Sequence, residues 1–294
     1  MGCKTYKSFY NPNENLYKII MKIPIKGTIV NTCRAMYSSL RNFFRLPYLI
    51  LLGIPLVIPP LLGRINSGGN KFDVINIIIL GLTYLLSWFV ACIFSAQSQR
   101  HIITKIKPNT FFEILHSISQ REIRYCLYSI YLTIYIYWAP ALLIGISFIF
   151  AGGEPIIPIL IGITLILIAA FYSMRFLLVA PFLACYENNY SFRELMRASK
   201  STLKCNLFRV FFIPSFMGIS FGLVVGVVGA VGRYLGPYNS VYIPYIEGGI
   251  ELLKNYIFII LTSSCAAQIY IFFEKDFEAK LAKIKNPQIE DKAL

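Results

Sequence analysis

Long runs of apolar residues are the feature that most constrains how this chain can fold. A helix needs about 20 apolar residues to cross the roughly 30 Å hydrocarbon core of a bilayer. Six runs of this kind occur, at residues 46–63, 74–96, 125–150, 156–175, 207–232 and 250–273. We therefore predict an all-α fold, a polytopic membrane helix bundle with six transmembrane helices.

The composition agrees with this prediction. Of the 294 residues, 56% are hydrophobic and 14% are charged, whereas a soluble domain carries about 25% charged residues. This balance argues against a water-soluble enzyme, a disordered chain and a secreted mini-protein.

Two of the six runs have irregular features. The first contains Pro55, Pro59 and Pro60, so we expect its helix to be broken or kinked near its outer end. The fourth continues past Arg175 as apolar sequence up to residue 185, which is too long for one span. We expect a bend at Pro181, with the last turns lying at the interface.

Charge placement predicts the orientation. Of the 28 Lys and Arg residues, 23 fall on the side of the two termini and four fall on the other side. The positive-inside rule then makes both termini cytoplasmic, in a multi-pass plasma-membrane protein. The formal net charge of +14 is matched by anionic lipid headgroups, which lie nearer to these residues than nucleic acid would.

An internal repeat is the next feature. Residues 34–41 match residues 197–204, and residues 42–45 match 206–209 after one inserted residue. A weaker copy at residues 110–115 aligns with 191–196. Any amphipathic helix that precedes a span would look similar, so the alternative to a repeat is chance resemblance.

The repeat predicts the domain organisation. Each unit would be a cytoplasmic interfacial amphipathic helix followed by a helical hairpin of two spans. The expected parts are a basic N-terminal segment at 1–24, a six-span membrane domain at 25–273 with repeat units at about 25–96, 108–186 and 190–273, and a charged tail at 274–294.

The helix expected after residue 190 carries a basic stripe. It begins with Ser191 and Glu194, a capping-box pattern in which each side chain binds a helix N-terminal N–H group. Cations follow at spacings of four, three and four, which is one face of a helix: Arg193, Arg197, Lys200 and Lys204. The stripe either holds the loop inside, binds anionic lipid or a phosphate ligand together with Arg175, or contacts a protein partner.

Two further stripes lie within the spans. Gly218, Gly222, Gly226 and Ala230 are each four residues apart; small residues in this pattern let two helices approach, either inside the bundle or at a homo-oligomer seam. An aromatic stripe consists of Tyr128, Tyr131, Tyr135 and Trp138. These rings either pack in the core or line a groove for a lipid or another amphiphile.

No catalytic constellation is apparent. The chain has two histidines and none of the common catalytic or metal-binding motifs, so we predict no enzyme activity, no cofactor and no metal site. No Asp or Glu lies in the middle of a span, although the sixth span offers polar side chains at Thr262, Ser263, Ser264 and Gln268. Their simplest role is hydrogen bonding between helices.

Residues 180–209 resemble the signature segment of uncharacterised bacterial six-span inner-membrane proteins. That group is similar to the membrane domain associated with some glycerophosphodiester phosphodiesterases. The matching positions are Glu187, Leu195, Ala198 and Ser199. The resemblance implies a location in the bacterial inner membrane and carries over no activity.

The leading hypothesis is therefore a membrane protein that handles or organises lipids or envelope components without catalysis. A small-solute transporter or channel is the alternative, and a membrane assembly scaffold is the third class. The partners expected are membrane lipids with anionic headgroups and a second copy of the chain, with no nucleic acid.

Overall fold

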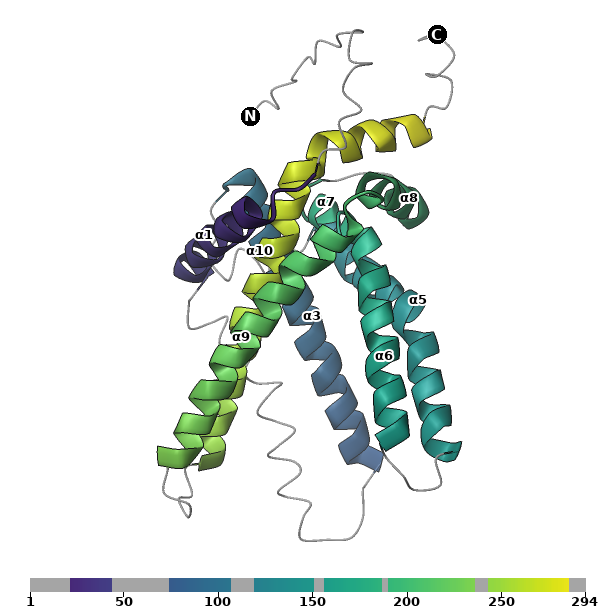
Figure 1. Cartoon of the computed structure of the whole chain (residues 1–294). Helices are drawn as coiled ribbons and strands as arrows, with labels where there is room; N and C mark the ends of the chain where they lie inside the picture. Colours follow the sequence, from purple (N-terminus) through teal and green to yellow (C-terminus); the bar gives the residue numbers. More distant parts are fainter. Residues whose placement is uncertain are drawn as a thin grey trace, which may run out of the picture.

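The computed structural model describes residues 22–43, 74–106, 119–150, 156–186, 190–235 and 243–285 (Figure 1). Helices make up nearly all of these residues, no strand occurs among them, and five of the helices are long and apolar enough to cross a membrane. The prediction of an all-α, membrane-embedded protein is confirmed at this level. The first predicted span, at residues 46–63, lies outside the described residues, as does the weak repeat copy at 110–115.

The spanning helices coincide with the apolar runs predicted from the sequence. They are α3 (Val74–Thr104), α5 (Gln120–Phe150), α6 (Ile156–Ser173), α9 (Leu207–Leu235) and α10 (Ile243–Lys285). Helices α3, α5 and α10 extend beyond their runs by more than a turn and α9 by three residues, whereas α6 ends two residues short of its run.

The shorter helices gather at one end of the bundle (Figure 1). They are α1 (Ile25–Phe43), the 3-10 helix η2 (Met174–Phe176), α7 (Val179–Cys185) and α8 (Phe192–Leu203). Helix α1 begins close to the expected start of the first repeat unit, and the Thr28 N–H donates to the carbonyl of Pro24 at 2.9 Å in its first turn.

The buried core lies at the same end as the short helices. Its largest fully buried side chains include Phe94, Tyr128, Tyr270 and Phe277, which come from α3, α5 and α10. Toward the other end the described spans expose apolar side chains; Leu82 on α3 and Leu223 on α9 are 62% and 67% exposed. Surfaces of this kind are suited to contact with lipid chains.

Helix α10 continues without a break past the expected end of the sixth span. Its C-terminal turns cross over α7 and α8 (Figure 1). Phe277 and Leu281 on these turns are buried, and the Phe277 ring packs against Phe182 of α7. The first half of the predicted charged tail at 274–294 is therefore a packed part of the bundle.

The fourth span does end in a bend, but Pro181 does not mark it. The helix gives way to η2 and a turn at Met174–Leu178, and α7 then begins. Pro181 is the third residue of α7, where its missing N–H costs nothing because the first-turn N–H groups of a helix have no intrahelical acceptor. The bend is possible because other elements bind the backbone groups that it frees, as described below.

Candidate functional site

Helix α8 begins with the capping box that the sequence predicts. The backbone N–H of Ser191 donates to Glu194 Oε2 at 2.7 Å, and the Glu194 N–H donates to Ser191 Oγ at 3.3 Å. These hydrogen bonds hold the pKa of the Glu194 carboxyl below its ordinary value. The apolar face of the helix, with Leu195, Ala198 and Leu203, is fully buried.

Helix α8 also binds backbone groups at the bend in the fourth span that have no partner within a helix. Ser199 Oγ donates to the carbonyl oxygen of Arg175 at 2.8 Å and accepts from the Leu178 N–H at 3.4 Å. From α5, the Tyr128 hydroxyl donates to the carbonyl oxygen of Phe176 at 3.1 Å. A chain in a membrane must satisfy its backbone polar groups internally, so these two side chains make the break possible and fix α8 beside it.

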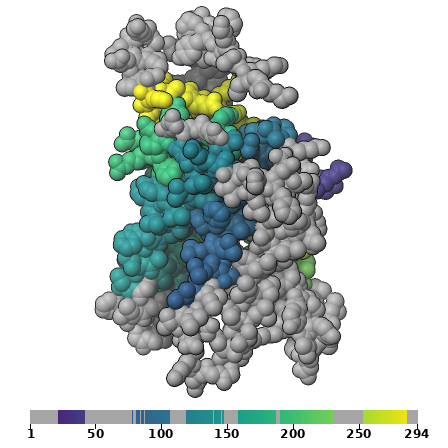
Figure 2. Space-filling model, turned by 180° about the vertical axis from the view of Figure 1, so that it is seen from behind, coloured from purple at the N-terminus to yellow at the C-terminus, as the bar shows by residue number. Residues whose placement is uncertain are grey.

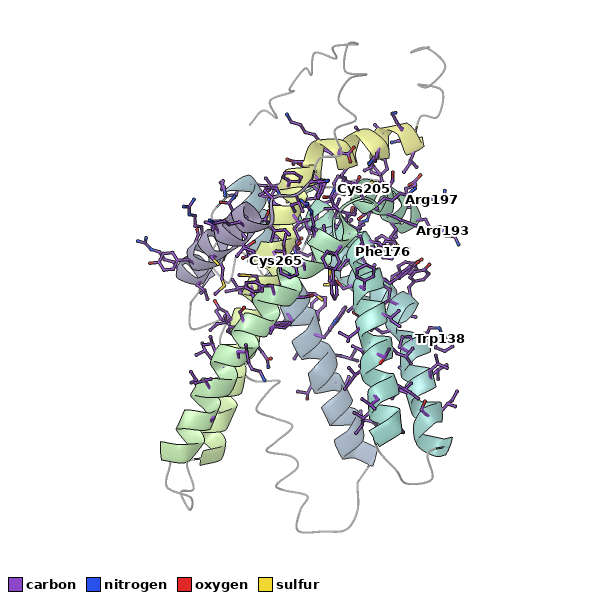
Figure 3. All side chains as sticks on the ribbon, in the orientation of Figure 1. Trp138, Phe176, Arg193, Arg197, Cys205 and Cys265 are labelled. Carbon is purple, nitrogen blue, oxygen red and sulfur yellow. The ribbon has the colours of Figure 1, made fainter. Side chains whose placement is uncertain are left out.

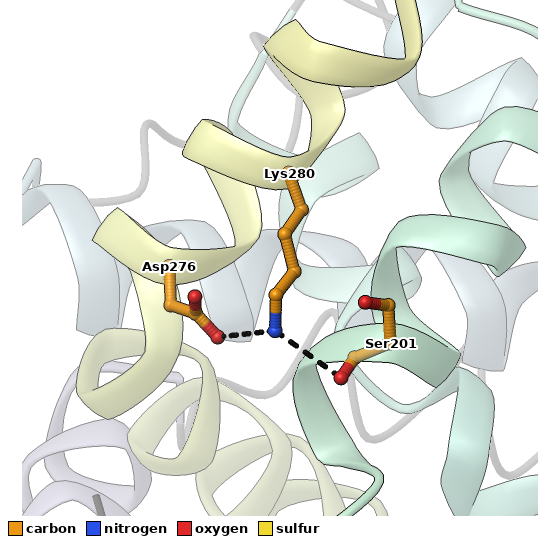
Figure 4. Close-up of polar contacts among 3 residues, drawn as sticks. All are labelled: Ser201, Asp276 and Lys280. Carbon is orange, nitrogen blue, oxygen red and sulfur yellow. Dashed lines mark hydrogen bonds and ion pairs between the residues drawn. The ribbon is translucent and has the colours of Figure 1, made fainter. Parts of the chain in front are cut away.

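A third contact holds the C-terminal end of α8. Lys280 Nζ of α10 donates to the carbonyl oxygen of Ser201 at 3.1 Å and to Asp276 Oδ2 at 2.8 Å (Figure 4). The last carbonyl groups of a helix lack intrahelical donors and attract cations. The orientation of α8 is thus fixed at its middle by Ser199 and at its C-terminal end by Lys280.

With its inner face fixed, α8 directs its cations outward. Arg193, Arg197, Lys200 and Lys204 are all exposed, and Figure 3 shows Arg193 and Arg197 extending away from the bundle. Among the residues that the structure describes, none of these four side chains forms an ion pair with a carboxylate. Their positive charge is available to a ligand outside the chain.

The aromatic residues of α5 lie next to this stripe and form a chain of ring contacts. Phe192 of α8 packs on Tyr131 with ring centroids 5.9 Å apart, and Tyr131 stacks on Tyr135 at the same distance. Farther along α5, away from α8, Trp138 is 60% exposed (Figure 3). Tyr128 differs from the others. It is 1% exposed, and its hydroxyl donates to a backbone carbonyl at the bend in the fourth span, so Tyr128 packs in the core and does not line a groove.

Cations and aromatic rings lie close together at one place, which we call the amphiphile face: Tyr131, Tyr135, Tyr172, Arg175 and Lys200. Tyr135 and Lys200 are exposed, and the other three residues are half-buried. The Arg175 guanidinium lies over the Tyr172 ring, 5.0 Å from its centroid. The Tyr135 and Tyr172 rings both contact the Phe176 ring, with centroids 6.3 Å and 5.5 Å apart. Lys200 directly follows Ser199, whose hydroxyl donates to the Arg175 carbonyl. On the surface in Figure 2, the teal α5 lies directly below the green of α8 and the yellow end of α10.

The side chains of this face are suited to binding a ligand. Guanidinium and ammonium groups bind phosphate oxygens through charge-assisted hydrogen bonds, and aromatic rings provide apolar area with a polar tip at a membrane interface. Tyr135 lies one turn beyond Tyr131 along α5 and is 51% exposed. The face therefore offers cationic groups at one end and apolar rings at the other.

Several residues of this region were not found from the sequence. Tyr172 and Phe176 lie in the fourth span and carried no pattern of their own. Ser199 was noted only within the family resemblance, and its bonds depend on the bend. The Ser119–Glu122 capping box, in which the Ser119 N–H donates to Glu122 Oε2 at 3.0 Å at the start of α5, was missed although its Ser-x-x-Glu spacing is readable.

The small-residue stripe on α9 lies apart from the amphiphile face. A Cβ added at Gly218 would lie 4.0 Å from the Phe258 ring of α10. At Gly222 and Gly226 it would meet nothing within 4 Å among the described residues, and Ala230 is exposed. Packing of the stripe within the bundle or against a second copy stays a prediction.

The polar residues of the sixth predicted span have separate roles. Ser263 Oγ lies 2.8 Å from Ser95 Oγ of α3, which lies 2.9 Å from the hydroxyl oxygen of Tyr125 on α5. Gln99 Nε2 donates to the same hydroxyl at 3.1 Å. Hydrogen bonding between helices is confirmed for Ser263, whereas Thr262 Oγ1 bonds carbonyl groups of its own helix.

Comparison of the chain with protein-family models, with curated proteins and with solved structures finds no match. The resemblance to bacterial six-span inner-membrane proteins therefore stays a prediction.

Proposed function

We propose that this chain is an integral membrane protein that binds an anionic amphiphile, without catalysis, on the face formed by α5, α6, η2 and α8. The ligand class is a lipid with a phosphate-containing headgroup. The observation that carries the proposal is the ring contact between Phe192, at the start of the cationic helix α8, and Tyr131 of the α5 stripe, together with the cation–π contact of Arg175 on Tyr172.

The headgroup end of this site would be formed by Arg175 and Lys200. Arg175 lies over the Tyr172 ring, and Lys200 follows Ser199, whose hydroxyl binds the Arg175 carbonyl. A phosphate there would therefore receive charge-assisted bonds from two cations. Arg197 extends the positive surface outward from this point. Cations near an anionic leaflet contribute about 1 kcal/mol each, and fixed geometry adds selectivity to that attraction.

The acyl chains would lie along α5. Tyr135 and Trp138 are half or more exposed on this helix. The Tyr135 ring stacks on Tyr131, which contacts Phe192 of α8, and Trp138 lies on the same side of the bundle as Arg193 and Arg197 (Figure 3). The arrangement matches a lipid whose headgroup is at the packed end of the bundle and whose chains run toward the opposite end.

The orientation proposed with this function makes the packed end cytoplasmic, in a bacterial inner membrane. Helices α1 and α8 and the C-terminal turns of α10 share that end (Figure 1). It is also the end to which the distribution of Lys and Arg assigns the inside.

The test is lipid analysis of the protein extracted with native membrane around it. Copurifying lipids are quantified by mass spectrometry for the wild type and for a variant carrying Arg197→Gln, Lys200→Gln and Lys204→Gln. The expected result is enrichment of one anionic lipid over bulk membrane in the wild type, and loss of that enrichment in the variant.

A matched control removes charge elsewhere at the same end. Lys275 and Lys283 are exposed on α10, and the pair Lys275→Gln and Lys283→Gln should leave the enrichment unchanged. A lipid profile equal to bulk membrane in the wild type would overturn the proposal. So would an equal loss in the control, since the attraction would then depend on total charge rather than on the amphiphile face.

One observation favours a second candidate, a small-solute transporter or channel. Beside the Ser95–Tyr125–Ser263 network, buried polar atoms lack a hydrogen-bond partner among the described residues: Gln99 Oε1, Ser98 Oγ and Ser264 Oγ. Such atoms would bind water or a polar solute in a hydrated path. Uptake of labelled solutes into proteoliposomes, with Gln99→Leu as the variant, tests this candidate.

A further inference from the structure

Helix α1 carries a second set of exposed cations that has no part in the amphiphile face. Its outward positions recur at spacings of four, four, three and four: Lys26, Val30, Arg34, Tyr37 and Arg41. Tyr37 is 71% exposed and Val30 is 42% exposed. At such spacings these side chains occupy one face of the helix.

The opposite face of α1 packs against the bundle and carries both apolar and hydroxyl side chains. Its apolar residues contact the buried core: Ile25, Ile29, Met36 and Leu40. Thr28, Thr32 and Ser39 are 6%, 0% and 0% exposed, and the helix packs against α10, α9 and α3. The buried face thus mixes apolar side chains with hydroxyl groups, and the outward face has a phenol ring and a valine between cations.

The exposed aromatic ring on the outward face is not what contact with water alone would favour. A helix at a protein–water boundary turns its apolar residues inward and its polar residues outward. In α1 the large aromatic ring is outside, flanked by Arg34 and Arg41. Tyrosine rings and arginine side chains are both favourable at the headgroup level of a bilayer, so the outer surface of α1 is suited to headgroups rather than to bulk water.

The position of α1 agrees with this reading. Helices α1 and α8 lie at the same end of the bundle and on opposite sides of it (Figures 1 and 2). In the sequence, Arg34 and Arg41 match Arg197 and Lys204 of α8. The two helices therefore present cations at one level of the membrane on two separate flanks.

We propose that the outward face of α1 is a second binding site for a lipid with an anionic phosphate headgroup. Arg34 and Arg41 bind the headgroup from either side of Tyr37, whose ring lies against the glycerol and upper chain region. This site does not require the amphiphile face, because no residue is shared between them.

The experiment counts bound lipids on the full chain in detergent micelles by native mass spectrometry. Phosphatidylglycerol is the probe, and phosphatidylcholine is the zwitterionic control lipid. The wild type should show two high-affinity phosphatidylglycerol molecules. Arg34→Gln combined with Arg41→Gln should leave one, with binding at the lost site weaker by about thirtyfold, as expected for two near-surface cations.

A second variant separates shape from charge. Tyr37→Ser keeps every cation and should still weaken the α1 site, whereas Lys275→Gln with Lys283→Gln should leave both sites intact. The inference is overturned if the Arg34/Arg41 variant retains both lipids, or if the Lys275/Lys283 control loses as much binding. The Arg197/Lys200/Lys204 variant reports on the amphiphile face alone, so failure of one site is distinguishable from failure of the other.

Discussion

Replacing Ser199 by alanine tests how α8 is fixed to the break in the fourth span. Ser199 is 0% exposed, and its hydroxyl binds two backbone groups, the carbonyl of Arg175 at 2.8 Å and the N–H of Leu178 at 3.4 Å. The first bond has good length and the second is near the limit for a hydrogen bond. We therefore count one full bond and neglect the other.

Leaving a buried backbone group without its partner costs about 1–3 kcal/mol. We expect Ser199→Ala to lower the free energy of unfolding by about 2 kcal/mol, which is roughly a thirtyfold change in the ratio of folded to unfolded protein. The loss of one oxygen atom adds little, because the alanine methyl group keeps the packing. Hydrogen exchange should accelerate most in α8, at residues 192–203.

The assay is unfolding of the purified protein in mixed micelles by increasing dodecyl sulfate, followed by the fluorescence of the two tryptophans, Trp88 and Trp138. Ser201→Ala is the matched control, since Ser201 is exposed on the same helix and the Lys280 bond to its backbone carbonyl survives. The control should lie within about 0.5 kcal/mol of the wild type. Equal stability of the two variants would refute the reasoning.

Three further predictions follow from other contacts. Tyr128→Phe deletes the buried hydroxyl bond to the backbone of the break and should cost about 1–3 kcal/mol in the same unfolding assay, while ring packing is unchanged. Ser95→Ala and Ser263→Ala should be non-additive by about 0.6 kcal/mol in a double-mutant cycle, because their oxygens are bonded to each other; strict additivity would contradict the network. The depressed pKa of Glu194 means that its capping box stabilises α8 above the ordinary glutamate value of about 4.3 and that this contribution is lost as the pH falls through the lower folded value. Hydrogen exchange of the first turn of α8 should rise over that acid range, and Glu194→Gln should abolish the pH dependence.

Local patterns in the sequence predicted the elements well. Apolar runs are set by the thickness of the bilayer, so the five described spans follow from hydropathy alone. The Ser191–Glu194 capping box depends on four neighbouring residues, and it was likewise readable. The cations of α8 are exposed as predicted because a helical period places them opposite Leu195 and Leu203.

Contacts between segments far apart in the chain could not be predicted from the sequence. The bend at Met174–Leu178 depends on acceptors and donors supplied by Tyr128 and Ser199, and no local residue marks it. Proline is a poor marker here because it fits the first turn of the helix that follows a bend as readily as the bend itself. The helical period likewise predicts that Gly222 and Gly226 share a face of α9, but it does not predict which helix packs against that face.

Helix α10 has a mechanical consequence. Its 43 residues form one hydrogen-bonded helix about 65 Å long at about 1.5 Å per residue, roughly twice the thickness of the hydrocarbon core. Ser263, deep in the bundle, and Lys280, at the end of α8, are parts of this single element. Figure 1 shows the last turns of α10 bent across the end of the bundle, over α8. A displacement of the span within the membrane would therefore shift the turns that hold Lys280 against Ser201, and the angle at which the surface cations of α8 meet the bilayer would change with it.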